Sequence, residues 1–194
     1  MPLFPELLDE KFPLEKTLSS GLKVLVRNLR PDDKDRLWTF FNEIPSHDKL
    51  YLQEDLSVPE VVEEWCNNLD YCAMMPLVAL VEDKIVGYAI LRHEMRTWKR
   101  HMGMARMVVH PEYRQKGIAS FLLHQLVDLG MHCGLEKLQA EFMAEQEVAM
   151  RLFEHSGFVK VATIPKYVID MTGKSHDFIL MVYNMRDDER HAAD

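Results

Sequence analysis

The spacing of apolar side chains along this sequence changes repeatedly between the period of a strand and the period of a helix. Residues 23–29 alternate around β-branched side chains, which is typical of a half-buried strand. A later segment has apolar residues three and four positions apart, which predicts one buried helix face: Ile118, Leu122, Leu126, Leu129 and Cys133. Because segments of both kinds follow one another along the chain, the pattern predicts a mixed α+β fold.

The same pattern predicts seven strands and four main helices. The strands are expected at residues 23–29, 77–81, 85–95, 102–110, 135–143, 159–171 and 178–183. The helices are expected to begin at Pro31, Val58, Ile118 and Glu145. Since the third helix connects strands 102–110 and 135–143, those two strands should run parallel. Gly87, inside the third strand, is expected to mark a bulge or a point of close approach.

A single domain is expected from a chain of 194 residues, of which 47% are apolar. Residues 1–22 are spaced by prolines and predict an extended arm with one helical turn, packed on the domain. Residues 23–185 form the domain itself. Residues 186–194 form a charged tail that is expected to fray.

Composition and charge exclude several classes of protein. The net charge of −8 argues against nonspecific binding to nucleic acid and favours a cationic substrate. The chain has no run of about twenty apolar residues, so no membrane span is expected. Its N-terminus lacks the basic and apolar segments of a secretory signal. The three cysteines, odd in number and without metal-type spacing, fit a reducing compartment, so a cytoplasmic protein is expected.

The stretch from Val108 to Ala119 joins an apolar strand to a helix and is the most informative part of the sequence. The first turn of a helix presents N–H groups without helical partners and the positive end of the helix dipole, which together suit a phosphate. Gly117 lacks a Cβ, so a ligand can approach the backbone there, and Arg114 and Lys116 add positive charge. These features predict a cradle for a diphosphate, with an ordinary basic turn as the alternative.

Neither of the two common phosphate-binding patterns, GxxxxGK(S or T) and GxGxxG, occurs here, since this turn holds one glycine. The pattern that remains is Arg114-x-x-Gly117-x-Ala119. It resembles the acetyl-CoA signature (Q or R)-x-x-G-x-(G or A) of the GNAT superfamily of N-acetyltransferases. The apolar strand before it and the long helix after it are the context that this signature has in the family.

A second segment, from Leu138 to Phe158, resembles another GNAT pattern, a strand with a central Glu followed by a helix that ends in Gly-Phe. The spacing is preserved at Leu138, Glu141, Ala149, Leu152, Gly157 and Phe158. Two positions depart from the pattern, because Gln146 stands where the family usually has Asn and Phe153 stands where it usually has Tyr. Two blocks in the right order make the resemblance specific, and it covers residues 23–185.

This resemblance implies a mixed αβα sandwich whose sheet has six or seven strands. The fourth and fifth strands, 102–110 and 135–143, would splay apart and hold the pantetheine arm of acetyl-CoA in the cleft. The cofactor-binding residues it implies are Val108, Val109, Arg114, Gln115, Lys116, Gly117, Ile118, Ala119, Ser120, Gln146 and Phe153. A primary amine on a small molecule or a protein would attack acetyl-CoA directly in a ternary complex. A homodimer is compatible with the resemblance.

The chemistry needs a neutral amine, although a lysine-type amine loses its proton only near pH ~10.4. Glu141, in the middle of strand 135–143, matches the Glu that acts as general base in ribosomal-protein-like GNAT members. The alternative interpretation is that Glu141 is an ordinary carboxylate that points to solvent. Glu94, late in the third strand, is the second candidate. Glu145 is the third, although it also suits the start of the last helix. A backbone N–H near Val109 could bind the developing oxyanion.

The sequence does not identify the residue that would act as general acid. In many family members a Tyr at the position of Phe153 protonates the leaving thiolate, and Phe has no proton to give. Four residues are replacements by chemical type alone: Tyr113, Tyr167, Tyr183 and His155. A thiolate with a pKa near ~8.5 can also leave without a dedicated acid.

A metal site is not predicted, although the chain has nine histidines. His93, His101 and His110 lie near the hairpin and the end of the fourth strand. However, the sequence has neither the HExxH motif nor the paired Cys or His spacing of a zinc site.

The sequence therefore predicts an acetyl-CoA-dependent N-acetyltransferase that needs no metal. The main alternative is a non-catalytic acyl-CoA-binding regulatory domain, which Phe153 in place of Tyr favours and which the loop at Gly117 does not exclude. A longer acyl donor, such as succinyl-CoA, would require a cation near the pocket that the sequence does not place.

Overall fold

The computed structural model describes residues 4–50 and 58–185. Its centre is a sheet of eight strands in the order β1-β2-β3-β4-β5-β6-β8-β7. The strands are β1 (Leu14–Thr17), β2 (Lys23–Asn28), β3 (Met74–Val81), β4 (Lys84–His93), β5 (Met102–Val109), β6 (Lys137–Met143), β7 (Val159–Ile169) and β8 (Ser175–Asn184). Among the strands that the structure describes, only β5 and β6 pair in parallel, as expected from the helix between them, and the other neighbours are antiparallel.

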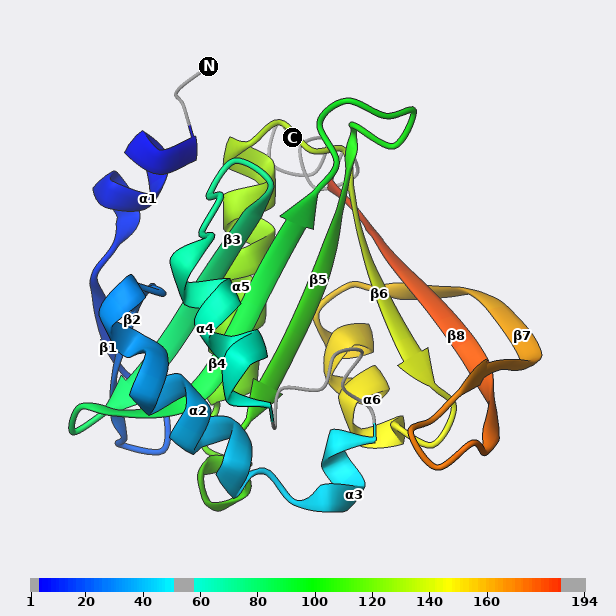
Figure 1. Ribbon diagram of the computed structural model, residues 1–194. Helices are drawn as coiled ribbons and strands as arrows, with labels where there is room; N and C mark the ends of the chain where they lie inside the picture. The colour runs from blue at the N-terminus through cyan, green and yellow to red at the C-terminus, as the bar shows by residue number, and fades with distance from the viewer. Residues whose placement is uncertain (1–3, 51–57, 186–194) are drawn as a thin grey trace.

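Helices cover both faces of the sheet (Figure 1). They are α1 (Phe4–Lys11), α2 (Lys34–Glu43), α3 (Ser46–Lys49), α4 (Pro59–Asn67), α5 (Ile118–His132) and α6 (Glu147–His155). One face packs on α5 and α6, and the other packs on α2 and α4, with a separate apolar core on each side. None of these helices within the described ranges is both long and apolar enough to cross a membrane.

The N-terminal arm differs from its prediction in two ways. It contains α1, a helix of eight residues rather than a single turn, and β1, which adds an eighth strand to the six or seven that were expected. The four residues of β1 are Leu-Glu-Lys-Thr, and most of them are exposed. Their sequence has no apolar alternation, so the segment does not form a strand by burying one face. It forms a strand because its backbone pairs with β2. The predicted tail, 186–194, lies outside the described residues.

Gly87 has both properties predicted for it. In the β3–β4 pairing, Leu80 lies opposite Ile85 while Ala79 lies opposite Gly87, so β4 carries one extra residue at this point. A Cβ on Gly87 would lie 3.0 Å from Leu122 Cδ1 on α5. The missing side chain therefore lets α5 pack directly on the centre of the sheet.

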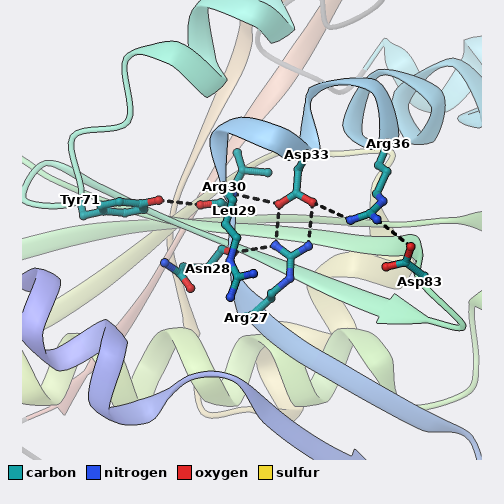
Figure 2. Close-up of polar contacts among 8 residues, drawn as sticks. All are labelled: Arg27, Asn28, Leu29, Arg30, Asp33, Arg36, Tyr71 and Asp83. Carbon is teal, nitrogen blue, oxygen red and sulfur yellow. Dashed lines mark hydrogen bonds and ion pairs between the residues drawn. The ribbon is translucent and has the colours of Figure 1, made fainter.

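A buried ion pair fixes the start of α2 against β2. Figure 2 shows the guanidinium of Arg27 donating two hydrogen bonds to Asp33, with Nη1 to Oδ2 at 2.5 Å and Nη2 to Oδ1 at 2.7 Å. The backbone N–H of Arg30 donates to the same carboxylate at 2.9 Å. Asp33 is fully buried, and Arg36 joins it to Asp83 in the β3–β4 turn. This network sets the position of the helix layer over the sheet.

Asp33→Asn is expected to lower the free energy of unfolding by about 3–5 kcal/mol, because Arg27 would remain buried without its full partner. Burial alone would raise the pKa of Asp33, but hydrogen bonds from Arg27 and the Arg30 backbone hold that pKa below its usual range. The carboxylate's contribution is thus present above the unfolded-state pKa and is lost as the pH falls through the folded-state pKa.

Chemical denaturation of Asp33→Asn across the acid range measures both effects. The matched control is Asp32→Asn, because Asp32 lies in the same turn but is exposed. Equal stability and equal acid dependence in the two variants would show that the buried pair does not anchor the helix.

Candidate active site

The strands β5 and β6 form a fork that opens along their length. Three residue pairs join them within the described residues, Met102 with Lys137, Gly103 with Leu138 and Met104 with Gln139. Beyond these pairs the two strands diverge, and α6 lies behind the opening (Figure 1). The predicted splaying of the fourth and fifth strands is confirmed. It leaves the later residues of β5 with an edge that faces the opening.

The open end of β5 leads into the predicted phosphate cradle. Two residues of this loop have left-handed backbone conformations, Gln115 with φ 58° and Gly117 with φ 91°. Gly117 is the N-cap of α5, and its carbonyl accepts the first helical hydrogen bond, from the Phe121 N–H. The N–H groups of the first turn of α5 therefore point out of the helix end beside the fork. This geometry fits the diphosphate site that the sequence predicts.

The two basic side chains of the loop contact protein groups. Arg114 donates from Nε to the Val109 carbonyl at 3.2 Å and forms a 2.6 Å ion pair with Asp48 on α3. Lys116 places its Nζ 4.8 Å from the centre of the Tyr113 ring. The charge of Arg114 is thus partly neutralised, and its side chain braces the loop against α3.

The turn between β1 and β2 supports the cradle from the other side. Ser20 Oγ donates a 2.8 Å hydrogen bond to the carbonyl of Lys116, directly before Gly117. The nearest atom to a Cβ placed on Gly117 would be Leu18 Cδ1, at 3.8 Å. Sequence reasoning missed both contacts, because they join positions 96 or more residues apart and no local pattern marks them.

The other predicted cofactor residues occupy different surroundings. Ile118 is buried in the core under α5, whereas Val108 packs toward the α2/α4 face. Ser120 is exposed and lines a cavity of about 200 Å³ between α5, the end of α6 and Tyr183 of β8. Gln146, at the start of α6, accepts a 2.8 Å hydrogen bond from the Met143 N–H through Oε1. Its side chain therefore shapes the corner between β6 and α6.

Glu141 lies in the fork on the α2/α4 face of the sheet. Along β6, Leu138, Ala140 and Phe142 are buried toward α5, so Glu141 points the opposite way. Its side chain is 22% exposed, and Oε2 lies 4.0 Å from Nη2 of Arg106 across the opening. Arg106 was not predicted, although an arginine inside the apolar strand β5 is a signal that could have identified it.

Glu94 is not brought together with Glu141. It follows the end of β4 in an exposed turn, where its carboxylate accepts a 3.2 Å hydrogen bond from Thr97. The last residue of β4, His93, pairs with Gly103, which lies at the closed end of the fork. Glu94 therefore lies beyond the closed end of the fork, whereas Glu141 faces Arg106 in the middle of β5.

Phe153 is packed in an aromatic cluster on the α5/α6 face. It is 2% exposed, and its ring centre lies 5.0 Å from Phe142 and 4.9 Å from Phe158 in edge-to-face contacts. Tyr183 continues the cluster, 5.3 Å from Phe158. The position thus contributes to the core that joins α6 to β6.

The remaining candidate acids are dispersed. Tyr113 packs edge-on against His110, 5.8 Å away, beside the cradle. Tyr167 is exposed on β7, and its ring lies 5.4 Å from Phe178 on β8. His155 is exposed at the end of α6. None of these contacts places a hydroxyl or an imidazole beside Glu141.

The histidines near β5 are also separated from one another. His110 is buried, with Nε2 3.2 Å from Glu43 Oε2 and with Nδ1 accepting from the Glu112 N–H at 3.3 Å. His93 lies at the other end of β4 and contacts the Arg100 carbonyl at 2.7 Å. Across residues 4–50 and 58–185, no group of three or more His, Cys, Asp or Glu side chains is arranged to hold a metal ion.

Comparison with known proteins places this fold and site in a family. The sequence profile of the acetyltransferase (GNAT) family matches residues 37–158. N-alpha-acetyltransferase 30 of Schizosaccharomyces pombe is 25% identical over 122 residues, covering 62% of this chain and 81% of the relative. The ribosomal-protein-S5-alanine acetyltransferase from Vibrio fischeri has a TM-score of 0.77 at 20% identity, covering 90% of this chain and 98% of that one. The candidate acetyltransferase yncA from Salmonella typhimurium, solved with its cofactor acetyl-CoA, has a TM-score of 0.71 at 19% identity, covering 84% and 94%.

Because the family profile spans more than half of the chain, this protein belongs to the acetyltransferase (GNAT) family. The predicted GNAT fold and the predicted enzyme class are confirmed. Enzymes of this family use acetyl-CoA. The non-catalytic alternative that Phe153 favoured is therefore not retained.

Proposed function

We propose that this enzyme transfers an acetyl group from acetyl-CoA to a primary amine of a small molecule or a protein. The observation that carries the proposal is the fork between β5 and β6, with the cradle at Gly117 on its α5 side and Glu141 on its α2/α4 side. A thioester that enters from the cradle reaches Glu141 through this opening. The acceptor amine approaches from the opposite face of the sheet.

The residues of the cradle fit the diphosphate of acetyl-CoA. The first-turn N–H groups of α5 would hold it, and the absent side chain of Gly117 lets it approach the backbone. Acetyl-CoA supplies the activated acetyl group as a thioester. The edge of β5 beyond Met104 carries backbone N–H groups that face the fork and can stabilise negative charge on the acetyl oxygen. Val109 is the last residue of this edge, before the loop that forms the cradle.

Glu141 serves as the general base that takes a proton from the acceptor amine. Its position across the fork from Arg106 keeps a positive charge beside the carboxylate. Phe153 carries no hydroxyl and packs against Phe142 and Phe158, so in this proposal the thiolate leaves without a dedicated acid. The amine attacks the bound thioester directly, and the chain forms no acetyl-enzyme.

The names of the relatives support an amine on a protein as one acceptor class. The ribosomal-protein-S5-alanine acetyltransferase is named for a protein substrate, and N-alpha-acetyltransferase 30 is named for acetylation at an alpha nitrogen. The acceptor for this chain is proposed only as a primary amine, because the structural relatives are under 25% identical.

The test is a measurement of free coenzyme A released from acetyl-CoA with three acceptor pools: peptides with free N-termini, lysine-type amines and amino acids. Acceptor-dependent release is expected in at least one pool, with the acetylated amine identified by mass spectrometry. Initial rates against both substrates should give intersecting lines, since a ping-pong pattern would indicate an acetyl-enzyme. Release that no primary amine accelerates would contradict the proposal.

Ser20→Ala is expected to raise the Kd for acetyl-CoA about 2–10-fold, because a net hydrogen bond is worth ~0.5–1.5 kcal/mol. The Ser20 hydroxyl holds the carbonyl of Lys116, and this fixes the backbone directly before Gly117. Calorimetric titration measures the change, and Ser19→Ala on the exposed neighbouring serine is the control. Equal affinities in both variants would show that the N-terminal arm does not shape the cradle.

A further inference from the structure

His176 lies between two carboxylates that come from different parts of the chain. Its Nδ1 is 2.8 Å from Oε1 of Glu145, in the turn after β6, and its Nε2 is 2.8 Å from Oδ2 of Asp170, after β7. The imidazole is only 6% exposed. Both ring nitrogens must carry hydrogen to donate to both carboxylates, and only the imidazolium form has two N–H groups. The contacts therefore fit a positively charged ring.

Asp170 is itself held in a fixed orientation. Its Oδ1 accepts from the backbone N–H and the hydroxyl of Thr172, at 2.8 Å and 2.6 Å, and from the Lys174 N–H at 3.1 Å. One oxygen thus organises the β7–β8 turn and the other binds His176. The hydrogen bonds from Thr172 and His176 hold the pKa of Asp170 well below its usual range. The hairpin tip and the start of β8 are consequently joined into one unit.

Glu145 connects this unit to the corner that leads into α6. The next residue, Gln146, is the predicted cofactor contact, and the Ala144 N–H donates to the Asp177 carbonyl at 3.0 Å. The pairing of β6 with β8 puts Glu141 directly opposite Leu180. Because side chains alternate along β8, His176 lies on the same face of the sheet as Leu180 and Glu141, just beyond the end of the β6–β8 pairing at Met143 and Phe178.

The charged groups around the ring come from the β6–α6 corner, the β7–β8 turn, β8 and α6. Glu145 and Asp170 bond to it, and these bonds raise the pKa of His176. The hydrogen bond from His176 is the main cause that lowers the pKa of Glu145, and the nearby charge of Lys174 lowers that pKa further. Asp177 is turned away, since its Oδ1 accepts from the Lys166 N–H at 2.9 Å. On α6, Glu147 is exposed and paired with Arg151 at 3.4 Å.

We infer that His176 is a positioning residue, whose imidazolium clamps the β7–β8 hairpin to the β6–α6 corner and so fixes the acceptor side of the fork. That the acceptor binds on this side of the fork rests on the proposed function, whereas the clamp itself rests on the two contacts of His176 to Glu145 and Asp170. A neutral imidazole has one N–H group, so it loses one of the two contacts. The clamp is therefore complete below the unfolded-state pKa of histidine and weakens as the pH rises through the folded-state pKa.

Hydrogen exchange of the backbone amides tests the clamp without any acceptor. His176→Gln is expected to speed exchange in residues 163–177 roughly tenfold, the equivalent of one lost hydrogen bond to a charged group. In the wild type, exchange in this segment should rise at alkaline pH beyond the intrinsic rate, and in His176→Gln it should not. The control is His155→Gln, on an exposed histidine that contacts the Arg151 carbonyl.

Steady-state kinetics then tests the link to the acceptor. The KM for the acceptor should rise roughly tenfold in His176→Gln, while kcat stays within about twofold. The acceptor KM of the wild type should increase at alkaline pH in a way that the variant lacks. Glu145→Ala, at a side chain 44% exposed, removes one contact and gives the same readouts if His176→Gln does not fold.

Each result separates the clamp from the proposed function. Unchanged exchange in both variants would overturn the clamp, whatever the enzyme acetylates. Faster exchange with an unchanged acceptor KM would overturn the positioning role. If no amine accelerates release of coenzyme A, the proposed function fails, and faster exchange in the variant would still support the clamp.

Discussion

Gly117→Glu is expected to weaken acetyl-CoA binding by at least ~100-fold. The backbone at this position has φ 91°, and its neighbouring N–H groups belong to the first turn of α5. A carboxylate here would compete for those N–H groups and repel the diphosphate. At ~6 Å and an effective dielectric constant of ~20, each pair of like charges costs about 3 kcal/mol, which is enough for a ~100-fold loss.

Gly117→Ala separates charge from backbone strain. A Cβ at this position would have only ordinary contacts with Leu18, at 3.8 Å and 3.9 Å, so alanine adds the left-handed strain without the charge. Calorimetry with acetyl-CoA, and thermal unfolding without it, should show similar stability losses for the two variants but a much larger affinity loss for the glutamate. Wild-type affinity in a folded Gly117→Glu variant would show that the diphosphate binds elsewhere.

The strand–loop–helix unit that carries the proposed cradle could be predicted from sequence because its determinants are local. One glycine at the start of an amphipathic helix fixes the N-cap, and the strand before it is an apolar run. The parallel pairing of β5 and β6 followed from the helix between them. These features depend on neighbours along the chain, and the structure confirms the fold that they imply.

The parts that sequence reasoning missed depend on contacts between distant segments. Ser20 reaches Lys116 and His176 reaches Glu145 only after the sheet is assembled. The strand β1 carries no apolar alternation and forms by pairing with β2. Glu141 was the first candidate base and Glu94 the second, and the register of β4 on β5 places Glu94 beyond the closed end of the fork.

Glu141→Gln is expected to lower kcat/KM by ~10²–10⁴, the usual contribution of a general base, while acetyl-CoA affinity changes little. Glutamine keeps the size of the side chain but cannot accept the amine proton. The loss should depend on the acceptor, because an α-amine has a pKa of about 7.7–8.0 and a lysine-type amine about 10.4. With an α-amine acceptor the variant should therefore recover most of its activity by about pH 9, where the amine is already neutral.

The matched variant is Glu94→Gln, which removes the other candidate carboxylate at the closed end of the fork. Its kcat/KM should equal that of the wild type, because no acceptor that reaches the thioester through the fork is near Glu94. Rates across pH 6–9 for both variants, with the fold checked by thermal unfolding, give the comparison. Wild-type rates in Glu141→Gln together with a loss of activity in Glu94→Gln would show that Glu94, and not Glu141, is the general base. A recovery at high pH that matches the amine's own titration would identify proton removal as the step that Glu141 performs.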